Sequence, residues 1–380
     1  MTRGHRLTAP LAAALLCAGC GSAAHLRASR PAAAPSSLAT SVATATANWA
    51  VVVMGGPAGR HEDFWQLLTR PAGTRAWRPV TPSGVASNGG LVAAPAGGRS
   101  LVAGFRPSQE LSFSPLATTT DNGTSWSAGL LDARLAGLPG ALAAAPGGRL
   151  LAVLANGSTA LSVDRGAHWT RLATLPSLAA SAAGRRCGLG SLTAAAFSPA
   201  HAPLLAGVCA RPGTVGLFAF TGSSWRLAGP AMPRALAASP ARLIGLSVAG
   251  PLETLLLRAG TGRGAVLLAA WSTNGRRWAF SPSLPLGGAQ VRSVSAGSGG
   301  ELGIVLDRRG GVTLAGPGAS WRRLPLLPPG SQTLSLGPGR RVDALAAAGR
   351  TFSDWEWALG SAAWAKMQVL RVPIPYGSSG

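Results

Sequence analysis

Seven tryptophans recur at near-regular intervals through most of this 380-residue chain. Successive members of the series are 49, 43, 56, 53, 43 and 43 residues apart, and they are Trp77, Trp126, Trp169, Trp225, Trp278, Trp321 and Trp364. A repeat of about 40–50 residues is the period of one four-stranded blade in a β-propeller. The spacing therefore predicts a propeller of seven blades, with six or eight as the alternatives.

Glycine and proline interrupt the chain too often for long helices. The sequence holds 52 glycines and 29 prolines, which is typical of short strands joined by turns. Residues 140–146, 149–155, 158–164 and 168–175 read as the four strands of one blade, and the same order recurs in residues 290–329. We therefore predict an all-β fold.

Two of the tryptophans end a shared motif, Ser/Thr-x-Asp-x-Gly-x-x-Trp. Its residues are Thr119, Asp121, Gly123 and Trp126 in one copy, and Ser162, Asp164, Gly166 and Trp169 in the other. An aspartate side chain can accept backbone N–H groups across a hairpin turn, and glycine permits the positive φ that such a turn needs. The tryptophan ring then covers the turn. Elsewhere the motif decays, but a glycine still stands three or four residues before each tryptophan of the series.

This motif resembles the Asp-box, also called the bacterial neuraminidase repeat, and the resemblance extends over about residues 47–380. Asp-box propellers include sialidases, photosystem II assembly-factor propellers, xyloglucan hydrolases and many secreted lipoproteins. The resemblance implies that both motif copies are structural turns at the periphery of their blades. It says little about function, because one fold supports many activities.

A closed ring requires the two ends of the propeller to meet, since an open ring would expose edge strands that pair with other molecules. The first blade is short of an inner strand. Either residues 38–47 supply it, or the C-terminal residues 369–375 wrap round to do so.

Residues 1–19 have the features of an export signal. Arg3, His5 and Arg6 give a basic start, and the apolar stretch that follows is too short to span a bilayer stably. We therefore expect this segment to be removed and the protein to leave the cytoplasm.

The sequence Leu-Cys-Ala-Gly-Cys at residues 16–20 resembles the bacterial lipobox. The resemblance implies that Cys20 becomes the new N-terminus and carries palmitate or a similar acyl chain. Cys17 stands where leucine is commonest, so ordinary signal-peptidase cleavage nearby is the alternative. The expected location is the extracytoplasmic face of a bacterial cell membrane, with a secreted form as the alternative.

Residues 20–46 are rich in Ala, Ser, Thr and Pro and contain few large apolar side chains. Such a segment cannot build a core, so we predict a flexible tether. The propeller is then expected to occupy residues 47–380.

Catalytic groups are hard to find in this composition. A sialidase needs a tyrosine nucleophile, and the only tyrosine is Tyr376, close to the C-terminus. The five histidines are scattered and show no metal-ligand spacing. We therefore predict no catalytic residue, no metal and no cofactor, and we expect a non-catalytic binding or assembly scaffold.

One acidic cluster keeps a second function open. In Asp354, Trp355, Glu356 and Trp357, strand alternation would place both carboxylates on one face and both indoles on the other. That combination could stack and hydrogen-bond a sugar, which would suit a cell-surface glycoside hydrolase of sialidase-like fold. The alternative is an outer blade strand whose tryptophans pack against a neighbour.

Cys187 and Cys209 are the cysteines of the expected folded body, and they flank a predicted hairpin within one blade. In an oxidising compartment a disulfide between them is reasonable, and two free buried thiols are the alternative.

The net charge of +22 predicts attraction to anionic surfaces. No helix, zinc finger or aromatic RNA-binding motif accompanies the dispersed arginines, so we expect no nucleic-acid partner. The expected partners are the membrane through the lipid anchor and an anionic envelope polymer, a glycan or a protein. An arginine patch on one face would favour an assembly factor for a membrane complex.

Overall fold

The computed structural model describes residues 39–55, 63–82, 90–105, 116–127, 135, 137, 139–337 and 341–373. All of them belong to one compact unit, Ala32–Gly380. Cys20 and the expected signal peptide, residues 1–19, lie outside the described residues.

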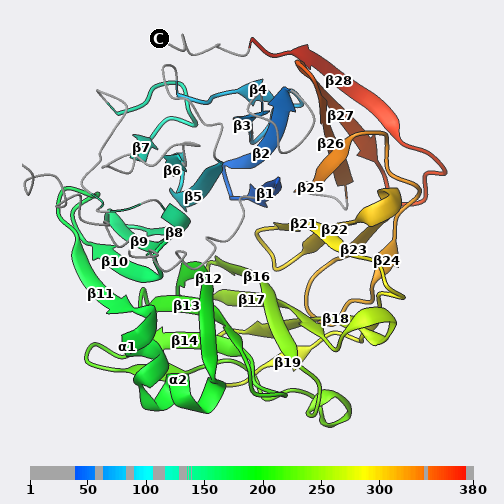
Figure 1. The fold of residues 1–380 in the computed structure, drawn as a ribbon. Coiled ribbons are helices and arrows are strands. Elements are labelled where there is room, and N and C mark those ends of the chain that lie inside the picture. Colours follow the sequence, from blue (N-terminus) through cyan, green and yellow to red (C-terminus); the bar gives the residue numbers. More distant parts are fainter. Residues whose placement is uncertain are drawn as a thin grey trace, which may run out of the picture. The chain divides into compact units, whose positions relative to one another are not determined.

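Seven groups of antiparallel strands surround a common centre (Figure 1), and the chain forms an all-β propeller, as predicted. The first blade contains β1 (Thr40–Ala43), β2 (Ala47–Gly55), β3 (Asp63–Pro71) and β4 (Arg78–Pro79). The second contains β5 (Leu91–Gly97), β6 (Ser100–Phe105) and β7 (Leu116–Thr119). The third contains β8 (Pro139–Ala145), β9 (Arg149–Leu154), β10 (Ser158–Ser162) and β11 (Thr170–Thr174).

The second half of the chain continues the same order. The fourth blade contains β12 (Leu189–Phe197), β13 (Pro203–Cys209), β14 (Gly216–Phe220) and β15 (Trp225–Leu227). The fifth contains β16 (Ala241–Ala249), β17 (Leu252–Ala259), β18 (Val266–Ser272), β19 (Ala279–Phe280) and β20 (Leu284–Pro285). The sixth contains β21 (Val291–Ala296), β22 (Leu302–Leu306), β23 (Gly311–Leu314) and β24 (Arg322–Arg323), and the seventh β25 (Ser331–Gly337), β26 (Arg341–Ala348), β27 (Thr351–Trp357) and β28 (Ala365–Arg371).

Two short helices, α1 (Leu175–Ala180) and α2 (Ala182–Cys187), connect the third blade to the fourth. Thr174 caps α1 and Ser181 caps α2, since each hydroxyl accepts a backbone N–H of the first turn. Single 3-10 turns occupy Arg234–Leu236, Gly262–Gly264 and Asp307–Arg309. No helix of the described residues is long and apolar enough to cross a membrane.

The hydrophobic core lies between the blades rather than at the centre of the ring. An apolar cluster fills each contact between successive blades, including the contact between the seventh and the first, where Met54 and Trp77 pack with Leu345 and Phe352. The second strands are covered on both faces by neighbouring blades, so they read as continuous apolar runs such as Arg149–Leu154 and Leu302–Leu306.

The ring closes through β1, so the first of the two alternatives is correct. β1 pairs antiparallel with β2 as the inner strand of the first blade, and it also pairs in parallel with β21 of the sixth blade. The C-terminal strand β28 is the outer strand of the seventh blade. β1 lies inside residues 20–46, which corrects the expected end of the tether: four small residues are enough for a strand when two neighbours pair with it.

Two glutamines join the seventh blade to the first. Gln332 accepts a hydrogen bond from the Val53 N–H at 2.8 Å and donates one to the Val53 carbonyl at 2.8 Å. Gln368 does the same for the backbone of Trp77, at 2.7 and 2.9 Å. Each side-chain amide therefore replaces a missing strand partner at the ring closure.

Cys187 and Cys209 form a disulfide, which confirms that prediction. It joins the end of α2 to the end of β13, with the two Cα atoms 4.9 Å apart. The bridge fixes the connection between the third and fourth blades onto the fourth blade.

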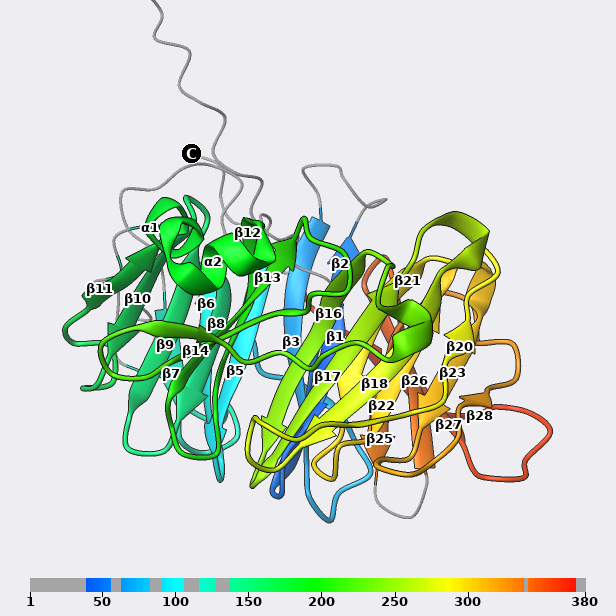
Figure 2. The same cartoon turned by 90° about the horizontal axis from the view of Figure 1, so that it is seen from below.

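The propeller has two ends that differ in their loops (Figure 2). We call the end that carries α1 and α2 the upper face; there the second strand of each blade leads to the third, and each blade leads to the next. We call the opposite end, with the turn between β1 and β2, the lower face.

Candidate functional site

A pocket of about 530 Å³ opens on the lower face where the first, sixth and seventh blades meet. Turns between first and second strands, together with the turn after β3, form its walls. Its polar and charged lining residues are Thr44, Asn48, Arg70, Thr74, Arg75, Ser298, Glu301, Arg341, Asp343, Asp354 and Glu356.

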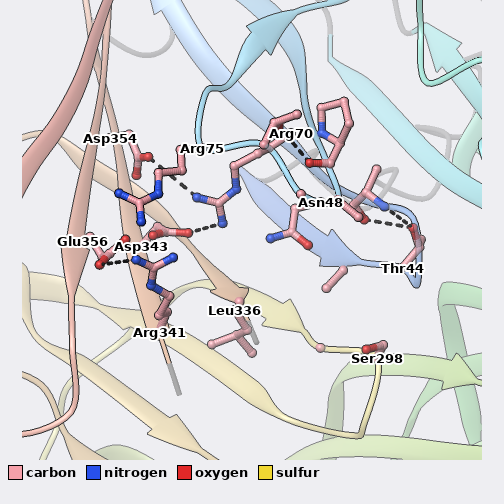
Figure 3. Close-up of a pocket in the computed structure, with 18 of the residues that line it drawn as sticks. Thr44, Asn48, Arg70, Arg75, Ser298, Leu336, Arg341, Asp343, Asp354 and Glu356 are labelled. Atoms are coloured by element: carbon pink, nitrogen blue, oxygen red, sulfur yellow. Dashed lines mark hydrogen bonds and ion pairs between the residues drawn. The ribbon is translucent and has the colours of Figure 1, made fainter. Parts of the chain in front are cut away.

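Three carboxylates converge in this pocket because of strand register (Figure 3). Asp343 on β26 is the direct cross-strand partner of Glu356 on β27. Asp354 is two residues from Glu356 and so lies on the same face of that strand. The structure thus places Asp354 and Glu356 together on the pocket side, and it adds Asp343.

Arginines from two blades face these carboxylates. Arg70, at the end of β3 in the first blade, donates a hydrogen bond to Asp343 and lies 3.8 Å from Asp354. Its guanidinium also lies 4.9 Å from the centre of the Trp77 ring. Arg341 pairs with Glu356 at 3.1 Å. Arg70 therefore matches charge across the seam between the first and seventh blades, and Arg341 matches Glu356 within the seventh.

Burial raises the pKa of Asp354 to about 7, with the nearby Asp343 carboxylate as the second cause and Arg70 opposing both. The Trp77 indole N–H slightly opposes this rise in the pKa of Asp354. Its contact with the carboxyl is weak, because neither Trp77 Nε1 nor Asp354 Oδ1 makes a hydrogen bond of normal geometry. Burial raises the pKa of Asp343 as well, against the attraction of Arg70. Since the two carboxyls interact, they take up protons as a pair.

The tryptophans of this strand lie away from the pocket. Trp357 is buried between the sixth and seventh blades, where Trp355 and Trp364 pack against the same cluster. The Trp357 indole donates to the Ser361 carbonyl at 2.8 Å, and Lys366 lies 5.2 Å from the Trp355 ring. The structure therefore separates the indoles from the two carboxylates, and a ligand in this pocket would meet carboxylates and arginines.

The two Asp motifs form matching turns at the lower face. The Asp121 carboxylate accepts the N–H groups of Thr124 and Ser125, and the Asp164 carboxylate accepts the N–H of His168. Thr119 and Ser162 accept the N–H groups of Gly123 and Gly166, whose φ angles are +78° and +91°. Trp126 reaches the Val80 carbonyl of the first blade, and Trp169 the Gly166 carbonyl of its own turn.

These hydrogen bonds favour the charged carboxylates. The Ser125 hydroxyl and N–H hold the pKa of Asp121 well below its usual range, and the His168 N–H lowers the pKa of Asp164 to about 2. Both groups are therefore acceptors within their turns, and neither lines the pocket.

A third turn of this kind contains Asn274 where the others have aspartate. The side-chain Oδ1 of Asn274 accepts the N–H groups of Arg276 and Arg277, and the Ser272 hydroxyl accepts the Gly275 N–H. The sequence signal for it, Ser-x-Asn-Gly-x-x-Trp at residues 272–278, differs from the full motif at the acidic position and by the loss of one residue before the glycine.

Arg70 and Asp343 are the site residues that sequence reasoning missed. They are 273 positions apart, and only the closure of the ring brings them together. Asp343 had a detectable signal, because β26 and β27 form a hairpin in which it faces Glu356. Among the described residues, no group of three or more His, Cys, Asp or Glu side chains has a geometry suited to a metal ion.

No protein-family model matches the chain, and no curated protein matches it. Solved structures are similar at low identity. YCF48 from Cyanidioschyzon merolae is 16% identical, with 83% of this chain and 94% of that chain covered and a TM-score of 0.49. An ancestral GH74 enzyme is 13% identical over 88% of this chain and 46% of its own, with a TM-score of 0.48. The lectin of Aleuria aurantia is 14% identical, with 90% of this chain and 97% of the lectin covered and a TM-score of 0.40.

Proposed function

We propose that this chain is an extracytoplasmic, lipid-anchored propeller of the Asp-box type that acts as a non-catalytic binding or assembly scaffold. The observation that carries the proposal is the pocket on the lower face, in which Arg70 pairs with carboxylates across the ring closure and Arg341 pairs with Glu356 within the seventh blade. Such pairing suits the recognition of a polar partner more than acid–base chemistry, because the carboxylates are engaged by arginine.

The pocket favours a ligand that carries both signs of charge. Arg75 is exposed at its rim, and the side chains of Arg341 and Glu356 are 41% and 19% exposed. A short segment of a protein partner with neighbouring basic and acidic groups would exchange these ion pairs for its own. Glycans and anionic envelope polymers are the other candidate ligands.

The location outside the cytoplasm is supported by two features. The disulfide between Cys187 and Cys209 suits an oxidising compartment. The sequence around Cys20 resembles a lipobox, and acyl chains at that residue would make membrane association stable.

The binding site is tested with the purified full chain on arrays of zwitterionic peptides, glycans and anionic polymers. Saturable binding that falls at least about tenfold in Glu356→Gln would support the pocket as the site. A matched control is Glu301→Gln, at the edge of the same pocket, which contacts its own loop at Gly299. Saturable binding that is unchanged in Glu356→Gln would place the ligand elsewhere and refute this site.

A cell-surface glycoside hydrolase is the second candidate, because Asp354 has a pKa of about 7 beside two further carboxylates. A carboxyl that keeps its proton near neutral pH is the type of group that serves as general acid in glycosidases. Fluorogenic sialosides and aryl glycosides test this function. Turnover by the native chain that is lost in Asp354→Asn would replace the scaffold proposal, whereas equal background rates in both would support it.

A further inference from the structure

One end of the propeller presents a concentrated set of exposed arginines. They lie at the upper face over the third to seventh blades, in α2, in the loops that follow second and fourth strands, and at the adjoining strand ends. We call this set the upper basic surface, and its members are Arg185, Arg186, Arg211, Arg234, Arg242, Arg263, Arg292, Arg308, Arg309 and Arg371.

Acidic residues are nearly absent from this surface. Asp307 is the one acidic residue in the segments that carry these arginines, which are residues 175–188, 210–215, 228–242, 258–265, 286–292, 307–310 and 371. The lower face is mixed in sign, and its acidic residues are Asp121, Asp164, Glu253, Glu301, Asp343, Asp354 and Glu356. The upper basic surface therefore carries almost one sign of charge, whereas the lower face carries both.

The arginines of the upper basic surface are not consumed by ion pairs within the described residues. The ion pairs of the described residues join Arg70, Arg341 and His168 to carboxylates, and these three residues lie at the lower face. On the upper side, Arg242 and Arg258 are direct cross-strand partners in β16 and β17. Like charges in that arrangement repel each other, and an anion between them would remove the repulsion.

The path of the chain indicates which anion is close. β1 begins at Thr40, which pairs with Val51 midway along β2, and runs from there toward the turn on the lower face. Because β1 runs toward the lower face, the chain enters it from the side of the upper face, where the arginines lie. If residues 20–39 form the flexible tether that their composition predicts, their mean reach is about 25 Å, which would allow that end to approach the membrane.

We propose that the upper basic surface lies against the anionic headgroups of the membrane to which Cys20 is anchored. This inference rests on the lipid anchorage contained in the proposed function. The arginines attract anionic lipids within a screening distance of about 10 Å, and an anchor whose tether is short would let them approach within that distance. The pocket lies on the opposite face, so this orientation presents it to partners away from the membrane.

The surface is tested apart from the anchor, with the mature chain carrying Cys20→Ser. We expect it to bind vesicles of phosphatidylcholine mixed with phosphatidylglycerol, not vesicles of pure phosphatidylcholine, and to dissociate as salt rises. Removing four upper charges together should weaken binding by at least about tenfold; the substitutions are Arg186→Gln, Arg234→Gln, Arg263→Gln and Arg292→Gln.

The matched control removes the same charge from the lower face, through Arg99→Gln, Arg165→Gln, Arg276→Gln and Arg277→Gln. It should bind within about twofold of the parent. Equal losses in the two variants would show that net charge alone acts, and would overturn the proposal. So would binding to soluble polyglycerol phosphate in the absence of vesicle binding.

Acylation is measured independently, by mass spectrometry of the N-terminal peptide of the chain with Cys20 intact. An unmodified Cys20 would refute the anchor and with it the proposed orientation. An acylated Cys20 with no face-specific vesicle binding would refute the surface and leave the scaffold function standing. The two failures are therefore distinct results.

Discussion

Arg70 lies between two buried carboxylates that come from the other end of the chain. Asp343 and Asp354 are each about 1% exposed, and Arg70 contacts both. Replacing one partner of a buried ion pair typically costs about 3–5 kcal/mol, because a charge is left without compensation. Arg70→Met should therefore lower the free energy of unfolding by about that amount at pH 8, measured by urea denaturation.

The same variant has a recognisable pH dependence. Without Arg70 both carboxyls should bind protons more readily, so much of the lost stability should return at pH 5. Arg75→Met, at the exposed rim of the pocket, is the matched control and should change stability little. A loss in Arg70→Met that is the same at both pH values would show that packing on Trp77, rather than charge, is what Arg70 contributes.

The raised pKa of Asp354 predicts how the stability of the native protein depends on pH. Its pKa of about 7 in the folded state is higher than the value of about 3.9 in an unfolded chain. Because the folded protein holds this proton more tightly, the free energy of unfolding should fall as pH rises from about 4 to about 7. The slope contributed by this group is at most about 1.4 kcal/mol per pH unit.

Asp354→Asn should remove that component of the pH dependence, as measured by urea denaturation at several pH values. Asp164→Asn is the control, since the lowered pKa of Asp164 places its effect near pH 2 to 4 and with the opposite sign. If Asp354→Asn kept the full slope between pH 4 and 7, another group would be responsible.

At the scale of single elements, the turn after β7 depends on one carboxylate. Asp121 accepts several N–H and O–H groups within four residues of itself. Asp121→Ala leaves those donors to solvent and should lower the free energy of unfolding by about 1 kcal/mol, as loss of a capping acceptor does in helices. Differential scanning calorimetry measures it, and no change in Tm would mean that the turn is held by its backbone alone.

Asn274 allows the reverse test in the third turn. Asn274→Asp introduces a charged acceptor for the N–H groups of Arg276 and Arg277, whose side chains are also cationic. We expect a modest rise in Tm that is lost below about pH 4, where the new carboxylate is protonated. A fall in Tm at neutral pH would show that this shorter turn cannot hold a carboxylate.

Strands and turns were predictable from the sequence where their side chains contact residues close by in the chain. The tryptophan spacing predicted the blades because each motif tryptophan closes a turn built from residues just before it; Trp169 bonds to its own turn, and Trp126 reaches across to the first blade. The alternation of side chains along a strand predicted that Asp354 and Glu356 share a face, because this pattern too depends only on neighbouring residues. The sequence left residues 40–43 open between the tether, which their composition favours, and the inner strand of the first blade, and the pairing of β1 with β2 and β21 decides for the strand.

At the scale of the whole molecule, prediction from sequence ends where the ring closes. The contacts of Arg70 with Asp343, of Gln332 with Val53 and of Gln368 with Trp77 each span more than 270 residues. No period or local pattern encodes them, since each joins a residue to a partner in a different repeat. The carboxylates of the pocket were therefore partly predictable, and the arginine that pairs with them was not.

The closure also yields a prediction about local opening. Neighbouring blades meet through apolar clusters throughout the ring, but the first and seventh are also joined by amide side chains that bond to the Val53 and Trp77 backbones. Each net hydrogen bond contributes about 1 kcal/mol, and an unpaired buried backbone group costs more.

The double variant Gln332→Ala, Gln368→Ala should therefore open at this seam before the rest of the ring unfolds. Hydrogen exchange should accelerate selectively in β2, in the turn before β4 and in β26. Gln290→Ala, whose side-chain amide donates to the nearby Gly288 carbonyl rather than across the seam, should leave the pattern unchanged. Uniform acceleration in all blades would instead mean that the ring unfolds as one unit, with the seam no weaker than the apolar contacts beside it.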